Sequence, residues 1–119
     1  DIPASVREIA AGSCSDGFVA KGKQQPAGPA GARQGLNSYT QWFAGNPDMA
    51  GNYLGYDGPY PPFNDLRMHR YFFRVFALDV AQLELPTLFT AADVLAAMQG
   101  HVLAEAALHG TYTLNPALR

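Results

Sequence analysis

The clearest alternation along the chain lies in residues 69–80. One set of alternate positions holds His69, Tyr71, Phe73, Val75 and Ala77, and the other holds Arg70, Phe72, Arg74, Phe76 and Leu78. A run of β-favouring residues with this period predicts a strand. Because both sets are largely apolar, we expect cover on both faces and therefore a central or near-central strand.

A different period follows at residues 90–100. Thr90 and Asp93 suit the N-cap and the third helical position, and Gly100 suits the stop. Apolar side chains then fall on one helical face at Val94, Leu95 and Met98. The pattern predicts a short amphipathic helix.

After that helix the pattern returns to period two. The alanine-rich residues 102–108 by themselves favour helix. Gly110 and the Thr-Tyr-Thr sequence at 111–113 disfavour it. We therefore predict a strand from about residue 106 to residue 113.

The stretch 11–37 is rich in glycine and proline and poor in periodic apolar residues, which is typical of a loop. Such a long loop either lies ordered over the surface or carries function. Aromatic side chains follow it at Tyr39, Trp42, Phe43 and Tyr53. We expect these to pack the loop down, with a pocket rim as the alternative. Residues 11–54 are thus a long loop region within one domain, 1–119.

Composition narrows the function classes. The chain has 119 residues, 48% of them hydrophobic and 15% charged, as expected for one globular domain. A net charge of −2 with scattered Lys and Arg argues against a nucleic-acid partner. Cys14 is the single cysteine and cannot form an internal disulfide, so a cytoplasmic and a periplasmic location both stay open.

Candidate binding chemistry gathers at residues 58–71. Prolines carry no N–H, so Gly58 and Tyr60 supply the amides that the loop 58–62 can aim at an anion. His69 and Tyr71 are two residues apart on the predicted strand and share a face. Imidazole suits an anion near neutral pH. Taken alone, the same residues also fit a tight turn and a core histidine.

Signatures of enzymes and metal sites are missing from the sequence. It has no nucleophile elbow, no zinc-type His-Glu helix and no phosphate-binding Gly-Lys loop. Asp57 and Asp65 flank the loop and could form an acid–base pair. Aspartate in such a loop more commonly serves to form a turn. His101 and His109 have no metal-ligand spacing around them. We therefore expect a binding protein without catalytic residues, metal or cofactor.

Three segments in order resemble the phosphatidylethanolamine-binding protein family, in its bacterial Raf kinase inhibitor-like branch: residues 1–4 (DIPA), 55–79 and 101–112. The resemblance implies a mainly β, sandwich-like fold with a short helix before the last strand. It also implies a small pocket for phosphate or phospholipid head groups such as phosphorylethanolamine. The residues that match the family's pocket are Gly58, Tyr60, Pro61, Pro62, His69 and Tyr71.

One departure from the family concerns its upstream motifs. Family members carry an Asp-Pro motif and a His-Trp motif before the DIPA segment, and this sequence begins after both. We therefore expect the C-terminal portion of such a domain, with its N-terminal strands absent. A separate N-terminal fragment or a homodimer would then cover the exposed strand. As an alternative function, the resemblance implies inhibition of a kinase or serine protease through the loop 11–54.

Overall fold

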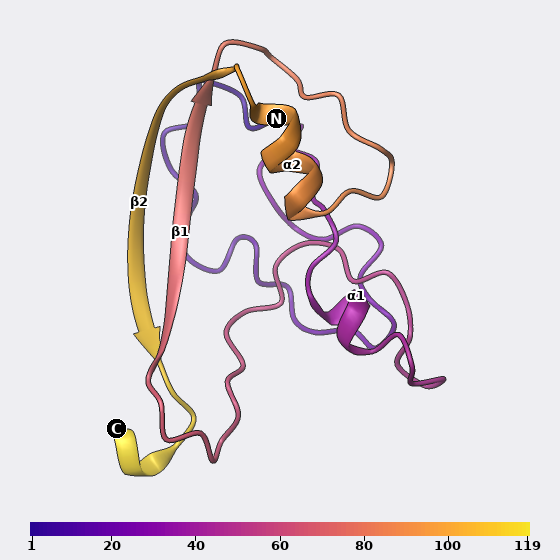
Figure 1. The fold of residues 1–119 in the computed structure, drawn as a ribbon, viewed down its shortest axis with the longest axis vertical. Helices are drawn as coiled ribbons and strands as arrows, with labels where there is room; N and C mark the ends of the chain where they lie inside the picture. Colours follow the sequence, from indigo (N-terminus) through magenta and orange to yellow (C-terminus); the bar gives the residue numbers. More distant parts are fainter. The chain divides into compact units, whose positions relative to one another are not determined.

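The computed structural model describes all residues, 1–119. Its regular elements in chain order are α1 (Tyr39–Trp42), β1 (His69–Leu78), α2 (Ala91–Met98), β2 (Val102–Tyr112) and the 3-10 helix η1 (Pro116–Leu118) (Figure 1). The chain forms two compact units. The first unit comprises Asp1–Asp57 and Val80–Gly100, and the second comprises Gly58–Asp79 and His101–Arg119. No helix combines the length and the apolar character needed to cross a bilayer.

The second unit is built on one antiparallel pair of strands, β1 and β2, which run side by side in Figure 1. We call this pair the hairpin, although the connection between its strands is long and contains α2. His69 lies opposite Tyr112, and the ladder continues to Ala77 opposite Ala104 before a bulge shifts the register. The strand predicted at residue 69 is confirmed. β2 begins at Val102 and not near residue 106, because pairing with β1 overrides the helix propensity of its alanines.

The expected central position of β1 is wrong. The sheet has two strands, so β1 is hydrogen-bonded along one edge. Side chains on both of its faces, such as Phe72 and Val75, are exposed. The fold thus contains a two-stranded antiparallel sheet and few helices. The sandwich with its missing strands stays a prediction.

The first unit has an aromatic core around Tyr53, whose side chain is fully buried. The rings of Phe18, Tyr39 and Phe43 lie 5.7, 5.8 and 5.4 Å from the Tyr53 ring, measured between centroids. Packing of Tyr39, Phe43 and Tyr53 against the loop is therefore confirmed. The same prediction is wrong for Trp42, which is 79% exposed at the end of α1.

Two glycines allow close backbone contact within the first unit. Gly22 has a φ of +94°, and a Cβ added there would lie 2.0 Å from the carbonyl oxygen of Asn52. A Cβ on Gly51 would lie 2.1 Å from the carbonyl oxygen of Lys21. Only glycine permits this approach. The loop 11–37, which carries no helix or strand beyond an isolated bridge at Leu36, is held down in this way.

The helix α2 begins as the sequence predicts. The Thr90 hydroxyl accepts the amide of Asp93, and the Asp93 carboxylate accepts the amide of Thr90, forming a capping box. Met98 is buried, while Leu95 on the predicted apolar face is half exposed. Gly100 follows with a φ of +81°, as suits a helix stop.

Candidate functional site

The loop 58–62 leads toward β1 within the second unit. Gly58 has a φ of +80°, a conformation that favours glycine. Pro61 is buried, whereas the Tyr60 side chain is 77% exposed. Neither the Gly58 amide nor the Tyr60 amide donates to a protein carbonyl. The loop thus offers backbone donors at the two positions that the sequence singles out.

His69 is the first residue of β1, and its imidazole is held by Asp65. The His69 Nε2 lies 2.7 Å from the Asp65 Oδ2, with side-chain exposures of 34% and 28%. The other carboxylate oxygen of Asp65 accepts the Arg67 amide at 2.9 Å. The Asn115 side chain donates to the Asp65 carbonyl oxygen at 2.9 Å. The turn before β1 therefore holds a carboxylate against the histidine ring.

The ionised form of Asp65 is favoured by these contacts. The hydrogen bond from His69 is the main cause that holds the pKa of Asp65 below its ordinary value, and the Arg67 amide adds to it. The charges of His69 and Arg67 act in the same direction. Asp65 is thus a negative charge beside the imidazole.

Tyr71 shares the His69 face of β1, as predicted from the strand period. Their rings are 6.4 Å apart between centroids with an interplanar angle of 24°. Tyr112 lies opposite His69 in the ladder. The structure therefore brings His69 and Tyr71 together. The loop residues 58–62 lie in the same unit as these two side chains.

Asp65 is the residue that sequence reasoning missed. The sequence reading gave it a turn role, and it has that role through the Arg67 amide, but it also pairs with His69. Its position four residues before the histidine, in a turn that enters the strand, was the available signal. Asp57 is different: it belongs to the first unit and lies against Lys23.

The remaining charged groups of the hairpin make structural contacts. His101 Nδ1 lies 2.7 Å from the Asp79 Oδ1, at the end of the hairpin opposite His69. Arg74 Nη2 lies 3.2 Å from the Glu105 Oε2. The ring of His109 is 5.4 Å from that of Phe72. No group of three or more His, Cys, Asp or Glu side chains is arranged to hold a metal ion.

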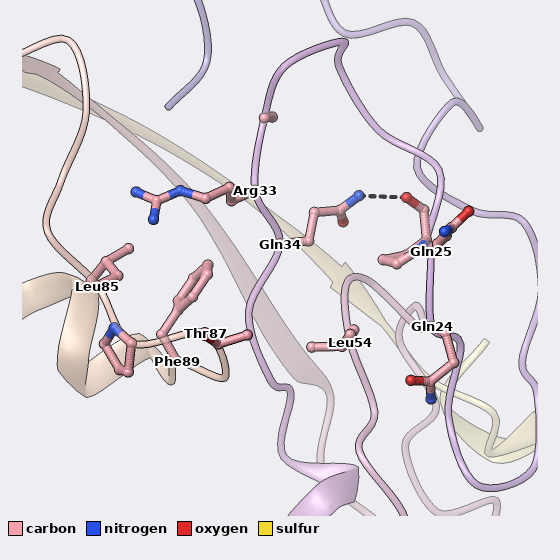
Figure 2. A pocket seen from close by; sticks show the side chains of 11 residues that line it. Gln24, Gln25, Arg33, Gln34, Leu54, Leu85, Thr87 and Phe89 are labelled. Atoms are coloured by element: carbon pink, nitrogen blue, oxygen red, sulfur yellow. Dashed lines mark hydrogen bonds between the residues drawn. The ribbon is translucent and has the colours of Figure 1, made fainter.

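A hollow of about 500 Å³ lies in the first unit (Figure 2). None of the predicted site residues lines it. The Gln34 amide nitrogen donates to the carbonyl oxygens of Pro26 and Ala27, at 2.9 and 2.8 Å. Arg33 donates to the Leu83 carbonyl oxygen at 2.6 Å and to the Asp1 carboxylate at 2.5 Å. The polar lining therefore holds the surrounding loops together.

Comparison with known proteins agrees with the order of segments in the sequence. The sequence model of a family described as phosphatidylethanolamine-binding protein matches residues 1–113. The chain belongs to this family. The match to the phosphatidylethanolamine-binding protein family covers almost the whole chain.

Two curated relatives of this chain are UPF0098 proteins. The protein from Methanothermobacter thermautotrophicus is 54% identical over 59 residues, which cover 50% of this chain and 36% of the relative. The protein from Aquifex aeolicus is 39% identical over 82 residues, which cover 69% of this chain and 40% of the relative. The chain therefore spans less than half the length of either relative.

A solved structure supports the same family. It is the crystal structure of a putative phosphatidylethanolamine-binding protein homolog from Chlamydia trachomatis D/UW-3/CX, with a TM-score of 0.54 and 36% sequence identity. The match covers 73% of this chain and 46% of the solved one.

Proposed function

We propose that this chain binds a small anion, such as phosphate or the phosphate of a phospholipid head group, through the second unit. The observation that carries the proposal is the half-exposed His69 ring, held by Asp65 at the start of β1 and preceded by a loop with two unengaged amides. These are the donor types that proteins use for phosphate oxygens. Gly58, Tyr60 and His69 are the proposed donors, and Pro61, Pro62 and Tyr71 shape the site.

The chemistry favours binding over turnover. An imidazolium supplies both a positive charge and a hydrogen-bond donor to an anion. Nucleophilic catalysis by a histidine–aspartate pair needs a hydroxyl or thiol within reach, most often from Ser or Cys. The second unit contains neither Ser nor Cys, and its side-chain hydroxyls come from Thr and Tyr. We therefore assign His69 to ligand recognition.

The family's name directs the choice of ligand. Because the family is described as phosphatidylethanolamine-binding, phosphorylethanolamine is the organic phosphate to test beside inorganic phosphate. The relatives are longer than this chain, so the proposal concerns the part of the site that these residues supply.

The test is a titration of the full chain with inorganic phosphate and, separately, phosphorylethanolamine. NMR of the imidazole groups follows His69, which we expect to shift and saturate with either ligand. His101, at the opposite end of the hairpin, is an internal reference in the same spectrum. A His101→Gln variant should bind as the parent does, and His69→Gln should not. If His69 stays unmoved up to millimolar ligand, the proposal fails.

A further inference from the structure

The hydrogen bond from His69 involves one particular ring atom. Nε2 faces the Asp65 carboxylate at 2.7 Å. An ionised carboxylate only accepts hydrogen bonds, so the hydrogen between the two groups belongs to Nε2. The contacts of Asp65 with the Arg67 amide and with His69 keep it ionised at neutral pH. Nδ1 is then the imidazole nitrogen left for a ligand.

We propose that Asp65 is a positioning residue of the anion site, which fixes the tautomer of His69 and thereby makes anion binding depend on protonation of Nδ1. The inference rests on the proposed function, because it assumes that His69 meets the anion. A neutral imidazole carries one hydrogen. With that hydrogen on Nε2, Nδ1 presents a lone pair, which repels the unprotonated, negatively charged oxygens of a phosphate. Only the imidazolium donates from Nδ1.

The alternative tautomer shows what Asp65 changes. An imidazole without a carboxylate on Nε2 can carry its single hydrogen on Nδ1 and donate to an anion while neutral. Such a site would keep part of its affinity at high pH. With Asp65 present, neutral His69 has no donor for the ligand. The carboxylate thus makes the His69 share of the anion affinity disappear as the pH rises, while the loop amides keep theirs.

The other groups near His69 do not fix its tautomer in place of Asp65. Tyr71 lies on the same face and Tyr112 opposite in the ladder, and both carry a phenol hydroxyl and not a carboxylate. Arg70 occupies the other face of β1, by the strand period. Arg67 donates its backbone amide to the Asp65 carboxylate, and its charge helps to lower the pKa of Asp65, so Arg67 also favours the ionised carboxylate. Asp65 is therefore the carboxylate that contacts the histidine.

The first experiment measures the tautomer directly, with no ligand. Imidazole nitrogen shifts of the uniformly ¹⁵N-labelled full chain distinguish a protonated from an unprotonated ring nitrogen. At a pH where His69 is neutral, we expect Nε2 to be protonated and Nδ1 unprotonated. A neutral His69 with its hydrogen on Nδ1 would overturn the inference. This measurement needs no variant and so does not depend on whether a substitution folds.

The second experiment follows phosphate affinity against pH. In the parent, the affinity should fall by up to about tenfold per pH unit once His69 becomes neutral, because the ligand binds together with one proton. The ionisation of phosphate itself is common to the parent and the variants and cancels in their comparison. In Asp65→Ala the decline should level off, because neutral His69 can donate from Nδ1. Asp79→Ala is the matched control: it removes the carboxylate from the His101 pair, also 2.7 Å long, and should keep the parental slope.

The outcomes separate the inference from the proposed function. An unchanged slope in Asp65→Ala would overturn the role of Asp65 while phosphate binding stands. Failure of phosphate to bind the parent in acid would overturn the anion site itself, while the ligand-free tautomer still shows whether Asp65 fixes the ring.

Discussion

Lys23 Nζ lies 3.2 Å from the Asp57 Oδ1, and the two side chains are only 6% and 4% exposed. The ammonium donates its hydrogen bonds to the Asp16 Oδ1 at 2.8 Å and to the Tyr56 carbonyl oxygen at 3.1 Å. The Asp57 Oδ1 receives no aligned hydrogen bond, so its contact with Lys23 is electrostatic. The other carboxylate oxygen, Asp57 Oδ2, accepts a hydrogen bond from the side-chain amide of Asn37 at 2.7 Å. One buried cation thus joins three segments of the first unit.

Removing that cation should destabilise the first unit strongly. Lys23→Met leaves the buried Asp57 carboxylate without a counter-charge, which typically costs about 3–5 kcal/mol. Urea denaturation followed by circular dichroism measures the loss in free energy of unfolding. Lys21→Met is the control, because Lys21 is exposed and makes no ion pair within 4 Å. A loss below about 1 kcal/mol in Lys23→Met would contradict a buried pair.

The pair between Lys23 and Asp16 predicts a loss of stability in acid. The hydrogen bond from Lys23 is the main cause that lowers the pKa of Asp16, with the Ala27 amide second. A carboxyl group whose pKa is lower in the folded state stabilises the fold above its unfolded pKa, near 4, and that contribution is lost as the pH falls through the folded value. Urea midpoints measured from pH 6 down to pH 2 should therefore fall. The fall should be shallower in Asp16→Asn.

Local sequence patterns predicted the start of β1 and the cap of α2, because each depends on residues within a few positions of one another. The pairs that decide burial are different. Lys23 and Asp57 are far apart in the sequence, and nothing in either neighbourhood marks them as partners. β2 begins earlier than predicted because pairing with β1 outweighs the helix propensity of its alanines. Asp65 was visible as a turn former four residues before His69, but its hydrogen bond to His69 also depends on the orientation of the ring, which the spacing does not determine.

The close contact at Gly22 gives a prediction about backbone strain. Gly12 and Gly22 both have a φ in the left-handed region, at +79° and +94°. A Cβ on Gly12 meets nothing within 4 Å, whereas one on Gly22 would lie 2.0 Å from the Asn52 carbonyl oxygen. Gly12→Ala should therefore cost about 1 kcal/mol for conformation alone. Gly22→Ala should cost a further 1–3 kcal/mol or so, since backbone must move. Equal losses in the free energy of unfolding, measured by urea denaturation, would show that the backbone at Gly22 is not packed against Asn52.

The capping box of α2 should be measurable as helix stability. Thr90→Ala removes the hydroxyl that accepts the Asp93 amide, and we expect a loss of about 1 kcal/mol. Amide hydrogen exchange of residues 91–94 is the direct readout, and exchange should quicken there first. Thr87→Ala changes an exposed threonine outside the helix and should leave these rates alone. Unchanged exchange in Thr90→Ala would mean that packing of Met98 alone holds the helix.

The hydroxyl of the buried Tyr53 side chain should contribute to the free energy of unfolding separately from its ring. It donates to the Met49 carbonyl oxygen at 2.6 Å and accepts the Lys21 amide at 2.9 Å. Tyr53→Phe keeps the ring contacts with Phe18 but removes both hydrogen bonds of the hydroxyl, leaving a part-buried carbonyl and a part-buried amide without this partner, which costs about 1–3 kcal/mol. Tyr60→Phe removes a hydroxyl from an exposed side chain and should change the free energy of unfolding by less than about 0.5 kcal/mol. Similar losses in the two variants would place the stabilisation in the aromatic rings. A large loss confined to Tyr53→Phe would place it in the hydroxyl, which links the segment before Lys23 to the turn that follows α1.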